Sequence, residues 1–220
     1  MKRMAAACLA ALALCALTAC GAGGGGSVKE GLYYEASGIC PDAVLLTVNG
    51  RDIPAERYFY WLTRSCDSVA AAGEPDWDSA RDEGTLADYV KEEALRCTVT
   101  YALVEQWAEE KGLALTDGDR AAMEASFRSD AEKWGGEEAY LAALADMGLD
   151  KAAAERLSAA HYLYLHLQET WQSGTEETLD DALSRGVEEA TVTYADTWDT
   201  IDPAAYSRRL SQLRAGASSS

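Results

Sequence analysis

Cysteine and histidine are the side chains of this 220-residue sequence best suited to nucleophilic catalysis or metal binding. The sequence contains six cysteines, which are Cys8, Cys15, Cys20, Cys40, Cys66 and Cys97. They form no CxxC pair and no Cys/His spacing typical of zinc ligands, so we expect no metal site. The last three allow either one disulfide with one free thiol, or three buried unpaired thiols.

The remaining polar residues do not form a recognisable catalytic pattern either. His161 and His166 lie five residues apart in one apolar segment, which places them on different faces of a helix and favours packing roles. Neighbouring carboxylates such as Asp180–Asp181 are typical of a solvated helix surface. The run Gly23–Gly26 follows no strand and begins no helix, so it is interpreted as linker and not as a phosphate loop. We therefore expect no catalytic residues and no cofactor.

The N-terminus has the pattern of a secretory signal. Two basic residues precede an apolar run, Ala5–Ala19, of about fifteen residues, whereas a membrane-spanning helix needs about 20. The sequence Leu17-Thr18-Ala19-Cys20 is similar to a lipobox, in which the cysteine sulfur receives a diacylglyceryl thioether. We expect residues 1–19 to be removed and Cys20 to become the lipidated first residue. The alternative is an ordinary cleaved signal with an incidental cysteine.

The segment after Cys20 is rich in glycine and predicts a flexible tether over residues 20–42. Two or three acyl chains on one cysteine hold a protein stably at a membrane, whereas a single chain holds it only reversibly. No later segment is apolar enough to cross a bilayer. We therefore expect an extracytoplasmic protein that is anchored to the outer face of the cell membrane through lipid on Cys20.

The mature chain is strongly acidic. Removal of the signal also removes two basic residues, so that 17 Lys and Arg remain against 37 Asp and Glu, a formal charge of −20. Nucleic acids and anionic phospholipid surfaces are themselves polyanions, and this charge argues against both as partners. The simplest role of the acidic residues is to keep the protein soluble.

Hydrophobic periodicity and capping residues predict about six helices in one domain, residues 43–200. These helices are expected to begin near Pro54, Thr85, Thr116, Glu137, Asp150 and Thr175. Ala43–Val48 and Ala190–Tyr194 resemble strands, and we expect them to pair because unpaired strands expose backbone groups. Residues 201–220 are expected to form a short helix and a frayed tail. The predicted fold is mainly α, with a two-stranded β pairing of the domain's ends.

Several motifs occur in a characteristic order along the chain. They are Val48-Asn49-Gly50-Arg51-Asp52-Ile53-Pro54-Ala55-Glu56, then Ala108–Asp117, then Trp134-Gly135-Gly136-Glu137-Glu138 with the following Tyr140-Leu141, and then a long apolar helix. In this order they resemble the helical module of the SurA/PrsA-type extracytoplasmic foldases, over about residues 44–172 and weakly over 190–214. The resemblance implies a chaperone domain similar to the SurA N-terminal domain and to the substrate-binding region of trigger factor.

The chain departs from those foldases after the long helix, where a parvulin-type prolyl isomerase domain commonly follows in the family. The segment after Trp171 contains no histidine and no loop similar to Gly-Gly-Asp-Leu-Gly. The sequence is therefore interpreted as a lipoprotein form that lacks the parvulin domain. We expect it to have no isomerase activity and not to be an enzyme.

These features favour a membrane-tethered holdase that binds unfolded or newly exported polypeptides through apolar and aromatic surface. Aromatic residues that lie near polar ones are the candidates for client binding, namely Tyr58, Trp61, Trp77, Tyr140 and Trp198. The alternative is a non-catalytic scaffold lipoprotein of the cell envelope that docks one specific folded partner. A large exposed apolar concavity would favour the holdase, and a flat surface with filled clefts would favour the scaffold.

Overall fold

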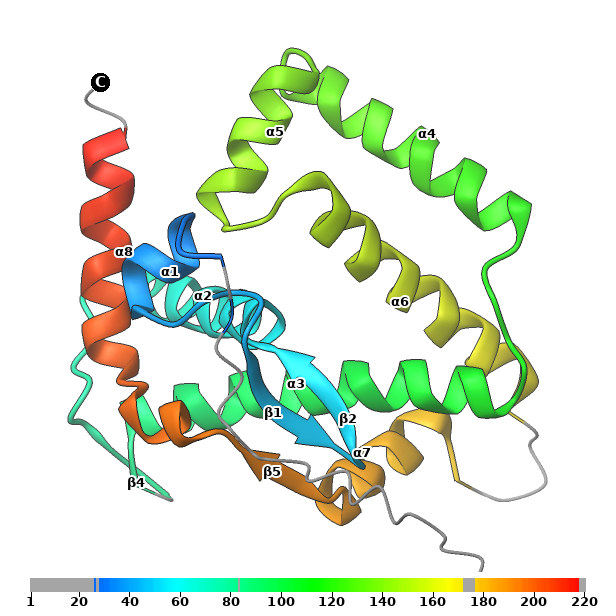
Figure 1. Ribbon diagram of the computed structural model, residues 1–220, viewed down its shortest axis with the longest axis horizontal. Helices are drawn as coiled ribbons and strands as arrows, with labels where there is room; N and C mark the ends of the chain where they lie inside the picture. The colour runs from blue at the N-terminus through cyan, green and yellow to red at the C-terminus, as the bar shows by residue number, and fades with distance from the viewer. Residues whose placement is uncertain (1–25, 27, 83, 172–176, 218–220) are drawn as a thin grey trace, which may run out of the picture.

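The computed structural model describes residues 26, 28–82, 84–171 and 177–217, and in them the chain is mainly helical with a small antiparallel sheet (Figure 1). The expected signal (residues 1–19) and the lipidation site Cys20 lie outside the described residues. None of the described helices combines the length and the apolar character needed to cross a membrane.

The helices and strands follow one another closely along the chain. The helices are α1 (Leu32–Ser37), α2 (Ala55–Ala71), α3 (Leu86–Glu110), α4 (Asp117–Lys133), α5 (Glu137–Asp146), α6 (Lys151–Thr170), α7 (Leu179–Glu189) and α8 (Pro203–Ala217), with a 3₁₀ helix η1 (Asp196–Thr200). The strands are β1 (Val44–Val48), β2 (Arg51–Pro54), β3 (Ala80–Arg81), β4 (Gly84–Thr85) and β5 (Val192–Tyr194).

Side-chain caps explain where several helices begin. Capping boxes start α3, α4 and α7, and they pair Thr85 with Asp88, Thr116 with Asp119 and Thr178 with Asp181. Asp150 caps α6, and the sequence predicts a helix start at this residue. Each such cap typically stabilises a helix by about 1 kcal/mol.

The three-stranded sheet joins the two ends of the domain. Its order is β2-β1-β5, and β5 pairs antiparallel with β1, so that Leu46 lies opposite Tyr194 and Val48 opposite Val192. The predicted pairing of the two strand-like runs is therefore confirmed. The sheet has one strand more than expected, because the turn at Asn49 leads directly into β2, which forms a hairpin with β1.

The hydrophobic core surrounds α3, which packs against α2, α6, α7 and α8. Aromatic rings close the end of the core where α1, α2 and α8 meet. The ring of Phe59 on α2 stacks on Tyr206 of α8 at a centroid distance of 5.4 Å. The ring of Tyr33 on α1 lies at a centroid distance of 6.1 Å from the same Phe59 ring. The first and last helices of the described chain are thus held to the same residue of α2.

Both ends of the domain differ from their predicted boundaries. The tether was expected to reach Asp42, but α1 lies within that segment and Tyr33 is only 2% exposed. The segment expected to be a short helix and tail contains α8, which buries Tyr206 and Leu210. Six-residue α1 is too short to show a helical period, and α8 gains its burial from α1, α2 and α3, all of them distant in the sequence.

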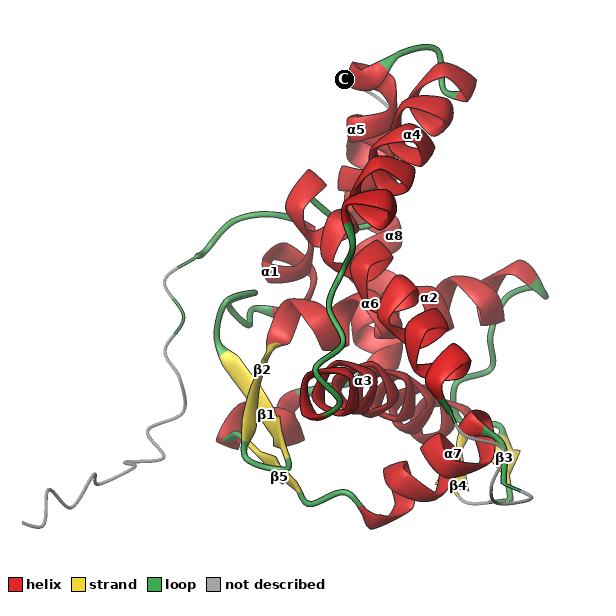
Figure 2. Ribbon diagram, turned by 90° about the vertical axis from the view of Figure 1, so that its right-hand side faces the viewer, coloured by secondary structure: helices red, strands yellow, loops and turns green. Residues whose placement is uncertain are grey.

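Helices α4 and α5 project from the body, and α6 returns beside them to pack on α3 (Figure 2). We refer to α4 and α5 as the arm. Ala131 is the one residue of α4 that is buried, so the arm has little core of its own. Tyr33 connects the body to the base of the arm, because its hydroxyl donates a 2.6 Å hydrogen bond to the carbonyl oxygen of Met147.

Candidate binding surface

Two of the aromatic residues predicted to bind clients belong to the core. Tyr58 is fully buried and Trp198 is 8% exposed, and their rings lie 4.9 Å apart. Lys91 covers Trp198 from outside, with its ammonium 4.8 Å from the ring centroid and 3.1 Å from the Trp198 carbonyl oxygen. Both aromatic side chains therefore stabilise the fold and are not available to a client.

The other three candidates are half-buried but do not meet. Trp61 of α2 packs against Tyr101 of α3 with a centroid distance of 4.8 Å. Tyr140 lies on the arm, where its ring meets Phe127 at 5.1 Å. Trp77 lies in the loop before β3 and packs against the edge of the core. The predicted set is thus divided between separate parts of the molecule.

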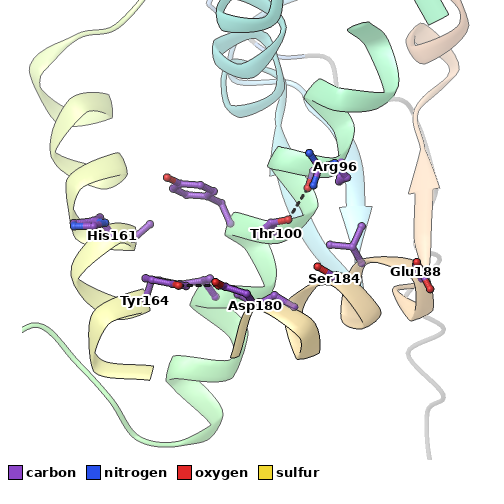
Figure 3. Close-up of a pocket in the computed structure, with 12 residues that line it drawn as sticks. Arg96, Thr100, His161, Tyr164, Asp180, Ser184 and Glu188 are labelled. Carbon is purple, nitrogen blue, oxygen red and sulfur yellow. Dashed lines mark hydrogen bonds between the residues drawn. The ribbon is translucent and has the colours of Figure 1, made fainter. Parts of the chain in front are cut away.

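A different set of residues forms a groove of about 580 Å³ between α3, α6 and α7, which we call the α6 groove (Figure 3). Apolar and aromatic side chains make much of its wall, namely Tyr101 and Val104 from α3, Tyr164 from α6, and Leu183 and Val187 from α7. His161 lies at its edge on α6 and is exposed.

Hydrogen bonds fix the walls of the α6 groove. The Tyr164 hydroxyl donates to Asp180 at 2.7 Å, which joins α6 to α7 and raises the pKa of the tyrosine. On α3, the Thr100 hydroxyl donates to the Arg96 carbonyl oxygen at 2.8 Å (Figure 3). These polar groups satisfy one another and form a polar rim around an apolar concavity.

Two further hollows continue the α6 groove along α3. The β5 groove, of about 660 Å³, lies between α3, α7 and β5 and shares Arg96, Val187 and Glu188 with the α6 groove. The hairpin groove, of about 930 Å³, lies between α2, α3 and β3 and shares Tyr89 and Glu92 with the β5 groove. The three hollows therefore form one connected surface.

The length of this surface matches a short peptide. Leu86 at one end and Val104 at the other are separated by eighteen residues of α3, which corresponds to about 27 Å at 1.5 Å per residue. An extended chain rises about 3.3 Å per residue, so the surface can accommodate about eight residues.

The described thiols do not add covalent chemistry to this surface. Cys40, Cys66 and Cys97 are unpaired in the structure, but only Cys66 is buried, so the alternative of three buried thiols holds in part. Burial raises the pKa of Cys66 to about 12, and burial also raises the pKa of Cys97. Both thiols are therefore protonated and weakly nucleophilic at neutral pH.

Among the residues that the structure describes, no group of three or more His, Cys, Asp or Glu side chains could hold a metal ion. The apolar and aromatic side chains that line the three hollows along α3 are suited to non-covalent contact with an extended ligand.

No family model, curated protein or solved structure matches this chain.

The most exposed aromatic residues of this surface were missing from the predicted set. Tyr89 is 53% exposed and Tyr194 is 46% exposed, and both line the β5 groove. A signal for part of this surface was present in the sequence. Tyr89, Glu93, Arg96 and Thr100 recur at helical spacing, and such a stripe of mixed character lies on one face of a helix.

Proposed function

We propose that this chain is a lipid-anchored extracytoplasmic chaperone of the holdase kind, which binds unfolded or newly exported polypeptides without isomerising prolyl bonds. The observation that carries the proposal is the connected surface of three hollows along α3. An adaptable binder of many clients needs accessible apolar area and weak contacts at several points more than a single deep pocket. A scaffold for one folded partner would be better served by a flat face.

The arm adds adaptability to the proposed binding surface. It lies beside α6, one wall of the α6 groove, and it has little buried area of its own. Elements with few buried contacts are those that open or shift at low free-energy cost. Small movements of α4 and α5 can therefore change the width of the groove without unfolding the body.

The proposed anchor places this surface close to the membrane. Eleven residues separate Cys20 from the start of α1, and a chain of that length spans at most about 40 Å when fully extended. Clients that emerge from the membrane surface would thus meet the grooves before they diffuse away.

The proposal is tested by suppression of aggregation. The mature chain carrying Cys20→Ser, which cannot be lipidated, is added to a chemically denatured model protein on dilution, and light scattering is followed. We expect scattering to fall in proportion to the added chain, up to about a molar equivalent. Unchanged scattering at a tenfold excess would show that the chain is not a holdase.

A matched pair of variants locates the activity. Ser184→Trp places a large ring in the α6 groove, and Ser129→Trp places the same ring on the exposed surface of α4. We expect the first variant to suppress aggregation much less than the second, with similar thermal stability for both. Equal suppression by both variants would remove the α6 groove from the binding surface.

A further inference from the structure

The strand β5 has an open edge. It is the outer strand of the order β2-β1-β5, and in the described part of the chain no strand lies on its other side (Figure 1). Such an edge presents unpaired backbone groups and can accept an additional strand.

The hydrogen bonds to β1 show which backbone groups of β5 are directed outward. The Asn49 amide donates to the Thr191 carbonyl oxygen at 2.9 Å, and the Ala195 amide donates to the Leu45 carbonyl oxygen at 2.9 Å. Because successive residues of a strand direct their peptide groups to alternate sides, residues 191, 193 and 195 face β1. The N–H and C=O groups of Val192 and Tyr194 therefore face the open edge.

This edge adjoins the β5 groove. Val192 and Tyr194 line the groove on one side, and Tyr89 and Val99 of α3 line it on the other. A polypeptide laid along β5 could pair with the outward backbone groups. Because its side chains alternate between the two faces of the sheet, every second one would enter the groove.

The charges around the groove select the side chains of the added strand. Glu92 and Glu188 line it, and neither has a basic partner among the described residues. The arginine of the groove, Arg96, is already held by Glu93 at 2.6 Å. The exposed rings of Tyr89 and Tyr194 are further sites at which a cation can bind. The groove is thus complementary to lysine and arginine.

We infer that a basic, extended client segment docks on the open edge of β5 and continues the sheet as a fourth strand. The inference rests on the proposed function and names the part of the α3 surface that provides main-chain pairing. A second copy of this chain is a poorer occupant, because each mature chain carries a formal charge of −20 and would present the same carboxylates to its partner.

The test uses the mature Cys20→Ser chain and two fluorescent nine-residue peptides, one alternating lysine with valine and the other alternating glutamate with valine. We expect the lysine peptide to bind and the glutamate peptide to bind at least about tenfold more weakly, since several carboxylates are involved. Equal affinity for the two peptides would overturn the assignment of a basic segment.

Val192→Pro removes an outward N–H and leaves the bonds to β1 intact, an arrangement that edge strands tolerate. We expect it to weaken binding of the lysine peptide by about fivefold or more, through one lost main-chain bond and a steric block. The control is Lys29→Pro, in the irregular segment before α1, and this variant should bind the lysine peptide with unchanged affinity. If Val192→Pro melts earlier than the control, the edge is tested in the unaltered chain instead. Amide hydrogen exchange of residues 190–195 is then measured with and without the lysine peptide, and the peptide should slow that exchange.

A second pair of variants tests the charges. The double variant Glu92→Gln/Glu188→Gln should bind the lysine peptide about threefold to tenfold more weakly than the unaltered chain. The control is the double variant Glu132→Gln/Glu155→Gln, at exposed positions of α4 and α6, which should bind the peptide with unchanged affinity.

The outcomes separate the two proposals. If the chain suppresses aggregation but Val192→Pro leaves peptide affinity unchanged, the β5 inference is wrong and the holdase proposal stands. If the unaltered chain neither suppresses aggregation nor binds peptide, the holdase proposal itself is wrong. Sedimentation that shows a dimer abolished by Val192→Pro would assign the edge to a second copy and overturn the inference.

Discussion

Asp119 has two partners on different helices. Its carboxylate accepts hydrogen bonds from the amide and the hydroxyl of Thr116, which caps α4, and it faces Nε2 of His166 on α6 at 2.8 Å. The contact with His166 is the main reason why the pKa of Asp119 is lowered to about 2, and the same contact raises the pKa of His166. The pair thus connects the start of the arm to α6.

A pH dependence follows from this pair. The folded-state pKa of His166 is raised, so its stabilising effect is fully present below the ordinary histidine pKa of about 6.5 and is lost as pH rises through the raised value. Asp119→Asn should lower the pKa of His166 more than Glu169→Gln does, because Glu169 lies farther away at 3.8 Å. Titration of the His166 ring by NMR measures both. Equal effects of the two variants would contradict the assigned cause.

Cys20 carries the second prediction at this scale. Thioether lipidation requires its sulfur, so Cys20→Ser should abolish labelling by radioactive or clickable fatty acid and release the protein from membranes. Cys40→Ser is the control, since Cys40 lies within the folded domain and should not affect labelling. Membrane retention of an acylated Cys20→Ser protein would disprove the lipoprotein interpretation.

Single residues were predicted well where their chemistry is local. Thr85 with Asp88 could be identified as a cap because both partners lie within one turn. Tyr58 was assigned to client binding although it is in the core, because its burial depends on Trp198, 140 residues later in the chain. The open grooves depend in the same way on how α6, α7 and β5 come to lie beside α3.

At the scale of elements, the contact between α1 and the loop after α5 is unusually close. Gly148 has a left-handed backbone with φ of 75°, and a Cβ atom there would overlap the ring of Tyr33. No other residue type therefore allows the Tyr33 hydroxyl to reach Met147.

Because of this contact, adding one methyl group at Gly148 should destabilise the fold strongly. Gly148→Ala should lower the free energy of unfolding by about 2–4 kcal/mol, from backbone strain together with overpacking. Gly112→Ala is a matched control, because Gly112 has a φ of 67° and nothing near its missing Cβ, and it should cost only about 1 kcal/mol. Urea unfolding of the two variants gives the difference. Equal losses would mean that α1 moves aside without cost.

The elements missing from the sequence prediction are short ones. Strands β3 and β4 have two residues each, β2 has four and α1 has six, so none is long enough to show a period. The long helices were predicted because periodicity and caps agree within them. The short elements form because tertiary partners such as β1 and α8 supply what the local sequence lacks.

At the scale of the whole molecule, residues 177–217 belong to the core. Six large side chains in this segment are buried, namely Leu179, Leu183, Trp198, Ile201, Tyr206 and Leu210. Burial of each typically contributes about 1.5–3 kcal/mol, and whole domains have about 5–15 kcal/mol of stability.

Truncation after Trp171 should therefore abolish cooperative unfolding. Removing only residues 218–220 is the control and should leave the melting temperature unchanged. Calorimetry of the two shortened chains decides the matter. A truncated chain that melts within a degree or two of the complete one would show that residues 172–220 are an independent tail.

The pairing of Thr47 with Thr193 also determines how the chain would fold if it is exported N-terminus first, as proposed. The two residues are 146 apart in the sequence, so at a synthesis rate of about 5–20 residues per second β1 is made about 7–30 s before β5. During that interval the face of α3 that α7 will cover is bare, and β1 itself has an open edge. With the proposed lipid anchor and holdase function, each new copy would begin as an unfolded chain at the membrane surface, where completed neighbours would bind it.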